Sequence, residues 1–66
     1  MIGLMGRVTG RIGAGLVGEV MVHIPERLGT EAFLAYRATP GELLEPGAMV
    51  VVVEYQPPRT VYVEPL

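Results

Sequence analysis

Side chains that could do chemistry are few in this sequence of 66 residues. His23 is the only histidine, and Cys, Asp and Ser do not occur. A zinc site needs several such ligands, and a general base needs an orienting partner, so His23 lacks companions for either task. The threonines have no recognisable activating neighbour, and Glu42 and Glu45 fall in a turn. We therefore expect no enzyme, no metal and no cofactor, with His23 on the solvent side of a strand.

Residues 13–18 spell G-x-G-x-x-G, the pattern of a dinucleotide-binding loop. That pattern works only where a strand leads into a helix whose first amides receive the pyrophosphate. The residues after Gly18 alternate with period two, which is typical of a strand, and the chain is too short for a doubly wound sheet. We interpret this stretch as the tight turn of a hairpin.

Arg7, Arg11 and Arg59, with Phe33 and Tyr36, could form a weak oligonucleotide-binding surface. Five-stranded barrels of the OB type bind single strands through aromatic platforms and basic grooves. The net charge of −2 argues against this interpretation, because nucleic-acid binders usually carry a basic excess. The alternative is that the arginines pair across strands with glutamates, namely Glu19, Glu31, Glu54 and Glu64.

The composition indicates one small domain in which some apolar surface stays exposed after folding. A chain of this length buries only about 60% of the surface that its unfolded form exposes. Half of the residues are hydrophobic and the mean hydropathy is +0.42, which is high for a domain that must cover itself with polar groups. Contiguous exposed apolar patches usually mark interfaces. No segment approaches the ~20 apolar residues of a membrane span, and Met1–Met5 lacks the features of a signal peptide.

The element around which the chain is organised is the apolar run 48–55, enclosed by Pro46-Gly47 and Pro57-Pro58. Its β-branched residues favour a buried strand. Counting by two, we expect Met49, Val51, Val53 and Tyr55 to face the core. Val50 and Val52 are then expected to face outward.

The remaining elements are predicted to be partner strands. Residues 6–12 form a first strand whose glycines permit a bulge. Residues 16–24 alternate most clearly: one face carries Leu16, Gly18, Val20, Val22 and Ile24, and the other carries Val17, Glu19, Met21 and His23. Residues 30–38 form a third strand, with Leu34 and Tyr36 placed inward and Phe33 outward because the charged Glu31 and Arg37 share a parity. Residues 60–64 form a fifth strand with Val61 and Val63 inward.

These elements predict the fold class. The connection 39–47 has room for one helical turn at most. Five short strands with regular turn signals predict an all-β protein, a small five-stranded antiparallel OB-fold-like β-barrel with little or no helix. Residues 1–66 are expected to form this single domain.

Stretches over nearly the whole chain resemble the C-terminal soluble domain of the NfeD-like family; they are Gly3–Val8, Gly18–Val20, Thr30–Ala35, Gly47–Val52 and Val61–Glu64. The family pattern runs G-x-x-G-x-V, a hairpin, G-x-V, a short E-x-aromatic-x-A strand, G-x-x-V-x-V-V and a closing x-V-x-V. Phe33 stands where many members have Trp. The resemblance implies an OB-like barrel without the usual long helix between the third and fourth strands. It also implies tethering by preceding membrane helices, which this chain lacks, so we expect an excised domain or a member without an anchor.

The family further implies partnership with membrane-scaffold proteins of the stomatin/flotillin (SPFH) type. Protease activity in long members belongs to another domain and does not transfer. The leading hypothesis is a non-enzymatic protein-interaction module on the cytoplasmic side of the membrane, which docks onto such a partner or onto copies of itself. The expected surface comprises Val17, Met21, Phe33, Val50 and Val52. The alternative is an OB-type module for single-stranded nucleic acid or oligosaccharide.

Overall fold

The computed structural model describes residues 1–27 and 29–66. Its elements are the strands β1 (Met5–Gly10), β2 (Gly18–Ile24), β3 (Gly29–Arg37), β4 (Met49–Gln56) and β5 (Thr60–Pro65), with a 3-10 turn η1 (Pro25–Arg27) after β2. β2 ends at Ile24, directly before Pro25. Leu28 lies outside the described residues.

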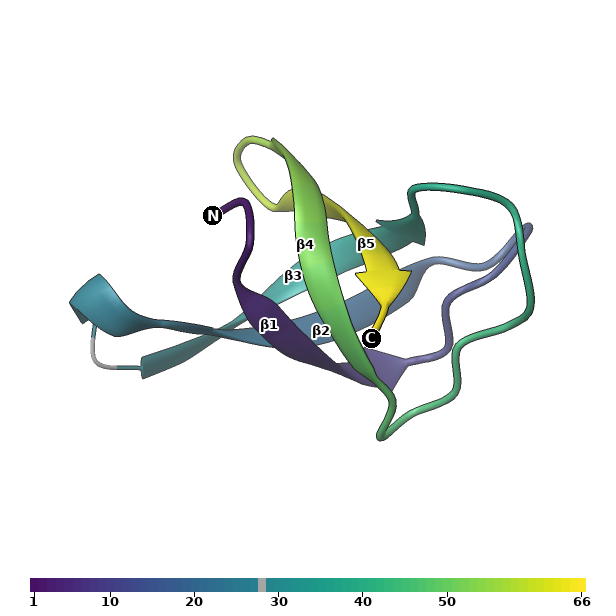
Figure 1. Ribbon diagram of the computed structural model, residues 1–66, viewed down its shortest axis with the longest axis horizontal. Helices are drawn as coiled ribbons and strands as arrows, with labels where there is room; N and C mark the ends of the chain where they lie inside the picture. The colour runs from purple at the N-terminus through teal and green to yellow at the C-terminus, as the bar shows by residue number, and fades with distance from the viewer. Residues whose placement is uncertain (28) are drawn as a thin grey trace.

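The strands close into a barrel in the order β1-β2-β3-β5-β4 (Figure 1). Four of the neighbouring pairs are antiparallel, and β1 completes the ring by pairing with β4. The fifth pair, β3 with β5, is parallel. The predicted fold class is confirmed, with this one parallel pair as a refinement. It arises because the loop 38–48 carries the chain across to β4, and β5 then returns between β4 and β3.

The core is built largely from valines that alternate with exposed residues. The inward residues of β2 are Gly18, Val20, Val22 and Ile24, as its alternation predicted, and Val61 and Val63 of β5 are likewise buried. Only Leu16 differs, since the strand begins at Gly18 and Leu16 is exposed in the preceding loop. The fully closed ring leaves these strands no free edge along the middle of the barrel, which is how small β-proteins avoid edge pairing.

The expected orientation of β4 is wrong from Met49 to Val53, and Tyr55, which was also expected to face the core, is 36% exposed. Val50 and Val52 are completely buried, whereas Met49 and Val53 are 40% exposed. The reason is a β-bulge: Val52 pairs with Val63 but Glu54 pairs with Tyr62, so Val53 is an extra residue. Strict alternation along β4 ignores this extra residue, so it assigns the wrong parity to the residues before it.

The expected orientation of β3 is also wrong. Phe33 and Ala35 are buried, whereas Leu34 and Tyr36 are exposed. The charged residues Glu31 and Arg37 do share a parity, but it is the inward one, because they pair with the buried Val22 and Val63. They lie at opposite ends of the barrel, where partners hold their charged groups, so a charged side chain there does not mark the solvent face.

The loops complete the structure without an α-helix in the described part. A register shift in β1 between Val8 and Gly10 confirms the expected bulge. The connection 38–48 contains no helical turn, and its Leu44 is buried and bridges Ile12. The Pro57-Pro58 peptide bond is cis and lies in the turn between β4 and β5.

Candidate protein-interaction surface

An apolar cleft of about 690 Å³ opens at one end of the barrel. One wall is the loop between β1 and β2, and the other is the end of β3 with the start of the loop 38–48. Leu16, Val17 and Tyr36 line it and are exposed, Val17 by 70%. An exposed apolar concavity of this kind fits an apolar segment of a partner better than it fits solvent.

The wall from the β1–β2 loop is a tight hairpin turn. The Leu16 N–H donates to the Gly13 carbonyl at 3.1 Å, and Gly15 adopts a positive φ of 75°. Glycine adopts that conformation without the steric cost of a Cβ. The strand β2 follows directly, so the G-x-G-x-x-G pattern is a hairpin and offers no helix N-terminus to a pyrophosphate.

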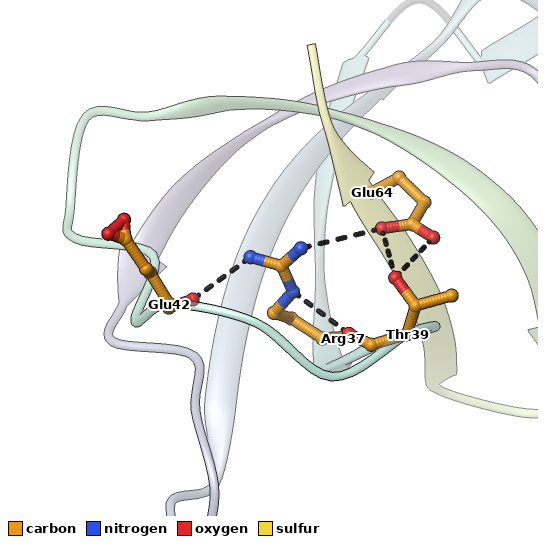
Figure 2. Close-up of polar contacts among 4 residues, drawn as sticks. All are labelled: Arg37, Thr39, Glu42 and Glu64. Carbon is orange, nitrogen blue, oxygen red and sulfur yellow. Dashed lines mark hydrogen bonds and ion pairs between the residues drawn. The ribbon is translucent and has the colours of Figure 1, made fainter.

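Arg37 holds the opposite wall through polar contacts (Figure 2). Its side chain is only 16% exposed. Its Nε donates to the Thr39 carbonyl at 3.0 Å, and Nη1 donates to the Glu42 carbonyl at 2.9 Å. Its Nη2 lies 3.7 Å from Glu64 Oε1, and the Thr39 hydroxyl donates to Glu64 Oε2 at 2.8 Å. A Cβ at Gly41 would lie 2.7 Å from the guanidinium carbon, so glycine leaves the space that Arg37 occupies.

The two walls are joined to each other. Ile12 and Leu44 exchange backbone hydrogen bonds of 3.0 and 2.9 Å. Leu43 packs so closely over Gly13 that a Cβ there would lie 2.5 Å from Leu43 Cδ2. Arg11 and Glu45 add an ion pair of 2.9 Å, which is well exposed and therefore worth little. The cleft is thus a preformed feature of the fold.

Aromatic side chains extend the apolar surface from the cleft onto the barrel. Tyr36 pairs with Tyr62 across β3 and β5, with ring centroids 5.8 Å apart and an interplanar angle of 33°. Leu34 is exposed on the same side of β3. Together the cleft and these exposed side chains of β3 and β5 form the candidate recognition surface.

The other end of the barrel is closed by a charged cluster. Arg59 lies over the Phe33 ring at 4.7 Å, donates to Glu31 Oε1 at 3.0 Å and donates to the Ala32 carbonyl. Tyr55 meets the same ring edge-on, at 6.2 Å between centroids. Arg59 therefore covers the part of β3 that extends beyond β5, which is a common way to protect a strand edge.

Two of the four glutamates that were expected to pair with arginines do so. Glu31 pairs with Arg59, and Glu64 pairs with Arg37. Glu19 instead accepts a 2.7 Å hydrogen bond from the Thr9 hydroxyl.

The structure separates the residues that were expected to form one surface. Val17 lines the cleft, and Met21 is half-buried on the outer side of β2. Phe33, Val50 and Val52 are buried in the core, so their expected outward orientation is wrong. Leu16 and Tyr36, which the cleft exposes, had been placed inward. Leu16 lies before the start of β2, where alternation does not apply, whereas Tyr36 follows the alternation of β3 and was misplaced because the parity of that strand was inverted.

His23 is exposed on β2, in agreement with the sequence. Among residues 1–27 and 29–66, no group of three or more His, Cys, Asp or Glu side chains could hold a metal ion. No helix within these ranges is long and apolar enough to cross a membrane.

The closed five-stranded barrel with a helix-free third connection defines a small OB-like domain. The family model for the NfeD C-terminal domain matches residues 5–64. This chain belongs to that family, as its sequence motifs predicted.

Two solved structures share the fold. The soluble domain of the NfeD protein YuaF from Bacillus subtilis has a TM-score of 0.76 at 24% identity, over 96% of this chain and 70% of that one. The second is the soluble domain of a membrane protein implicated in regulation of membrane protease activity, from Corynebacterium glutamicum. It has a TM-score of 0.73 at 25% identity, over 97% of this chain and 89% of that one. A search of curated proteins gave no match.

Proposed function

We propose that this domain is a non-enzymatic protein-interaction module that receives an apolar segment of a partner in the cleft. The observation that supports this proposal is the cleft itself. In it, Leu16, Val17 and Tyr36 are exposed between walls that are joined by backbone hydrogen bonds. A preformed apolar site lowers the entropy lost on binding. Apolar centres with polar rims are usual in protein interfaces.

The proposed partner is a membrane-scaffold protein of the stomatin/flotillin (SPFH) type. Membership of the NfeD C-terminal domain family supports this choice. The relative from C. glutamicum is described as a membrane protein implicated in regulation of membrane protease activity, which is compatible with a module that acts beside a membrane. We accordingly place the barrel on the cytoplasmic side, tethered by membrane helices of a longer protein.

Calorimetric titration with the soluble part of a stomatin-type protein tests this function. We expect saturable binding, which Val17→Glu or Tyr36→Ala weakens at least about tenfold, as loss of a central contact does. His23→Glu is the matched control, because His23 is exposed on β2 but lies outside the cleft. No binding by the parent domain, or equal binding by the cleft variants, would contradict the proposal.

A second candidate is supported by the Tyr36–Tyr62 pair, which resembles the stacking platforms of OB-type modules. The acidic Glu54 and Glu64 lie on the strands next to Tyr62, and they disfavour a phosphate backbone. An uncharged oligosaccharide is the better ligand of this class. Fluorescence-anisotropy titrations with labelled single-stranded DNA at low salt and with labelled oligosaccharides decide it, since flat curves for both would eliminate this candidate.

A further inference from the structure

A second apolar surface lies on the outer side of β1 and β4, which run next to each other (Figure 1). It consists of Met5, Met49, Val51 and Val53, and we call it the methionine face. Met5 is 57% exposed, Met49 and Val53 are each 40% exposed, and Val51 is half-buried. None of these residues lines the cleft. Four neighbouring apolar side chains on one strand pair form a continuous patch rather than scattered exposure.

Opposite charges flank this face. Arg7 pairs with Met49 at one end, whereas Glu54 follows Val53 at the other end and points outward beside Tyr62. The separation along β4 is roughly 15 Å, from the rise per residue of a strand. Within the described part of the chain, neither Arg7 nor Glu54 forms an ion pair or a side-chain hydrogen bond. The face therefore carries an uncompensated positive end and an uncompensated negative end.

We propose that the methionine face binds the same face of a second copy of this chain, about a two-fold axis with the two β4 strands antiparallel. In that arrangement Arg7 of each copy meets Glu54 of the other, so the complementary contact occurs twice. The two-fold axis passes near Met5 and Val51, so each of these residues contacts the same residue of the second copy. Methionine side chains are flexible and unbranched, so they can pack against the same side chains of a second copy. This inference does not depend on the function proposed for the cleft.

A charge-swap experiment tests the antiparallel pairing. Sedimentation equilibrium over a wide range of protein concentrations should show a reversible monomer–dimer equilibrium. Arg7→Glu and Glu54→Arg should each raise the dissociation constant by about tenfold or more, because like charges then face each other twice. The double variant should restore dimerisation, since its pairs are complementary again. A monomer at every concentration, or a double variant as weak as the single ones, would overturn the proposal.

Substitutions at the axis provide an independent readout. Met5→Lys places two ammonium groups close together and should abolish the dimer, whereas Met5→Leu should keep it. Circular dichroism should show both variants folded, since Met5 is exposed. Arg11→Glu is the control for a general charge effect, because Arg11 lies by Glu45 and away from this face. A dimer that survives Met5→Lys, or one that Arg11→Glu weakens equally, would place self-association on another surface and contradict the inference.

Discussion

Neighbouring valines on β4 lie in opposite environments. The Val52 side chain is completely buried among the other strands, and the next residue, Val53, is the 40% exposed residue of the bulge. If the same substitution is made at each position, the difference in stability between the two variants reports the effect of burial, because their composition and net charge are identical.

We predict that Val52→Asp unfolds the domain. An unpaired carboxylate in the core costs several kcal/mol, comparable to the roughly 3–10 kcal/mol of stability expected for a chain of this length. Val53→Asp should leave the chain folded, with a small change in melting temperature. Thermal melting followed by circular dichroism compares them. If Val53→Asp unfolds the chain and Val52→Asp does not, the assigned bulge is in the wrong place.

At the scale of elements, the loop 38–48 depends on one side chain. Arg37 binds the backbone carbonyls of Thr39 and Glu42, and it reaches Glu64 on β5 (Figure 2). Three separate segments thus meet at one guanidinium, which only arginine can supply because its donors are arranged in a planar fork.

We predict that Arg37→Ala loosens this loop and that Gly41→Ala does the same by displacing the guanidinium. The readout is hydrogen exchange at the Leu44 amide, whose bond to the Ile12 carbonyl joins the two walls of the cleft. A weakening of about 1.4 kcal/mol would speed that exchange about tenfold. Glu42→Gln should have no effect, because only the backbone carbonyl of Glu42 is bound. An equal effect of Glu42→Gln would show that charge, not backbone bonding, holds the loop.

The elements also differ in how well the sequence predicts them. β2 and β5 were correctly oriented, because charged or polar residues interrupt their apolar residues at period two. β4 offers an unbroken apolar run in which no polar residue marks the outer face, and the bulge at Val53 reverses the parity that strict alternation assigns. β3 was misread because Glu31 and Arg37 point inward at the barrel ends, where Arg59 and Glu64 hold them.

The candidate site was predictable only in part. Val17 could be identified, since it follows the outward parity of β2. The cleft itself could not, because it depends on the meeting of two loops far apart in the sequence. The contact between Ile12 and Leu44 that brings them together leaves no local pattern.

At the scale of the whole molecule, stability depends on closure of the ring. No disulfide is possible in this chain, and the core is one cluster to which every strand contributes. β5 pairs with both β3 and β4, and its Val61 and Val63 are completely buried. Without β5 the barrel would open and expose two strand edges.

We predict that a chain ending at Arg59 does not fold. Its far-UV circular dichroism should lose the β signal, or the chain should aggregate through the exposed edges. Removal of Leu66 alone is the control, since that side chain is 69% exposed and only its N–H bonds to Met49. A β spectrum and a cooperative melt from the chain that ends at Arg59 would show that four strands suffice.

The parallel pairing of β3 with β5 has a consequence for how the domain is made in the cell. The hairpin of β2 and β3 can form as soon as it leaves the ribosome, because its partners are close in sequence. The core cannot close at that stage, since the strand that completes it is synthesised last among the five. Until Thr60–Pro65 has left the exit tunnel, the inner valines of the first four strands stay accessible. We therefore expect that translation leaves a partly built sheet accessible to chaperones and that the barrel closes only after β5 is released.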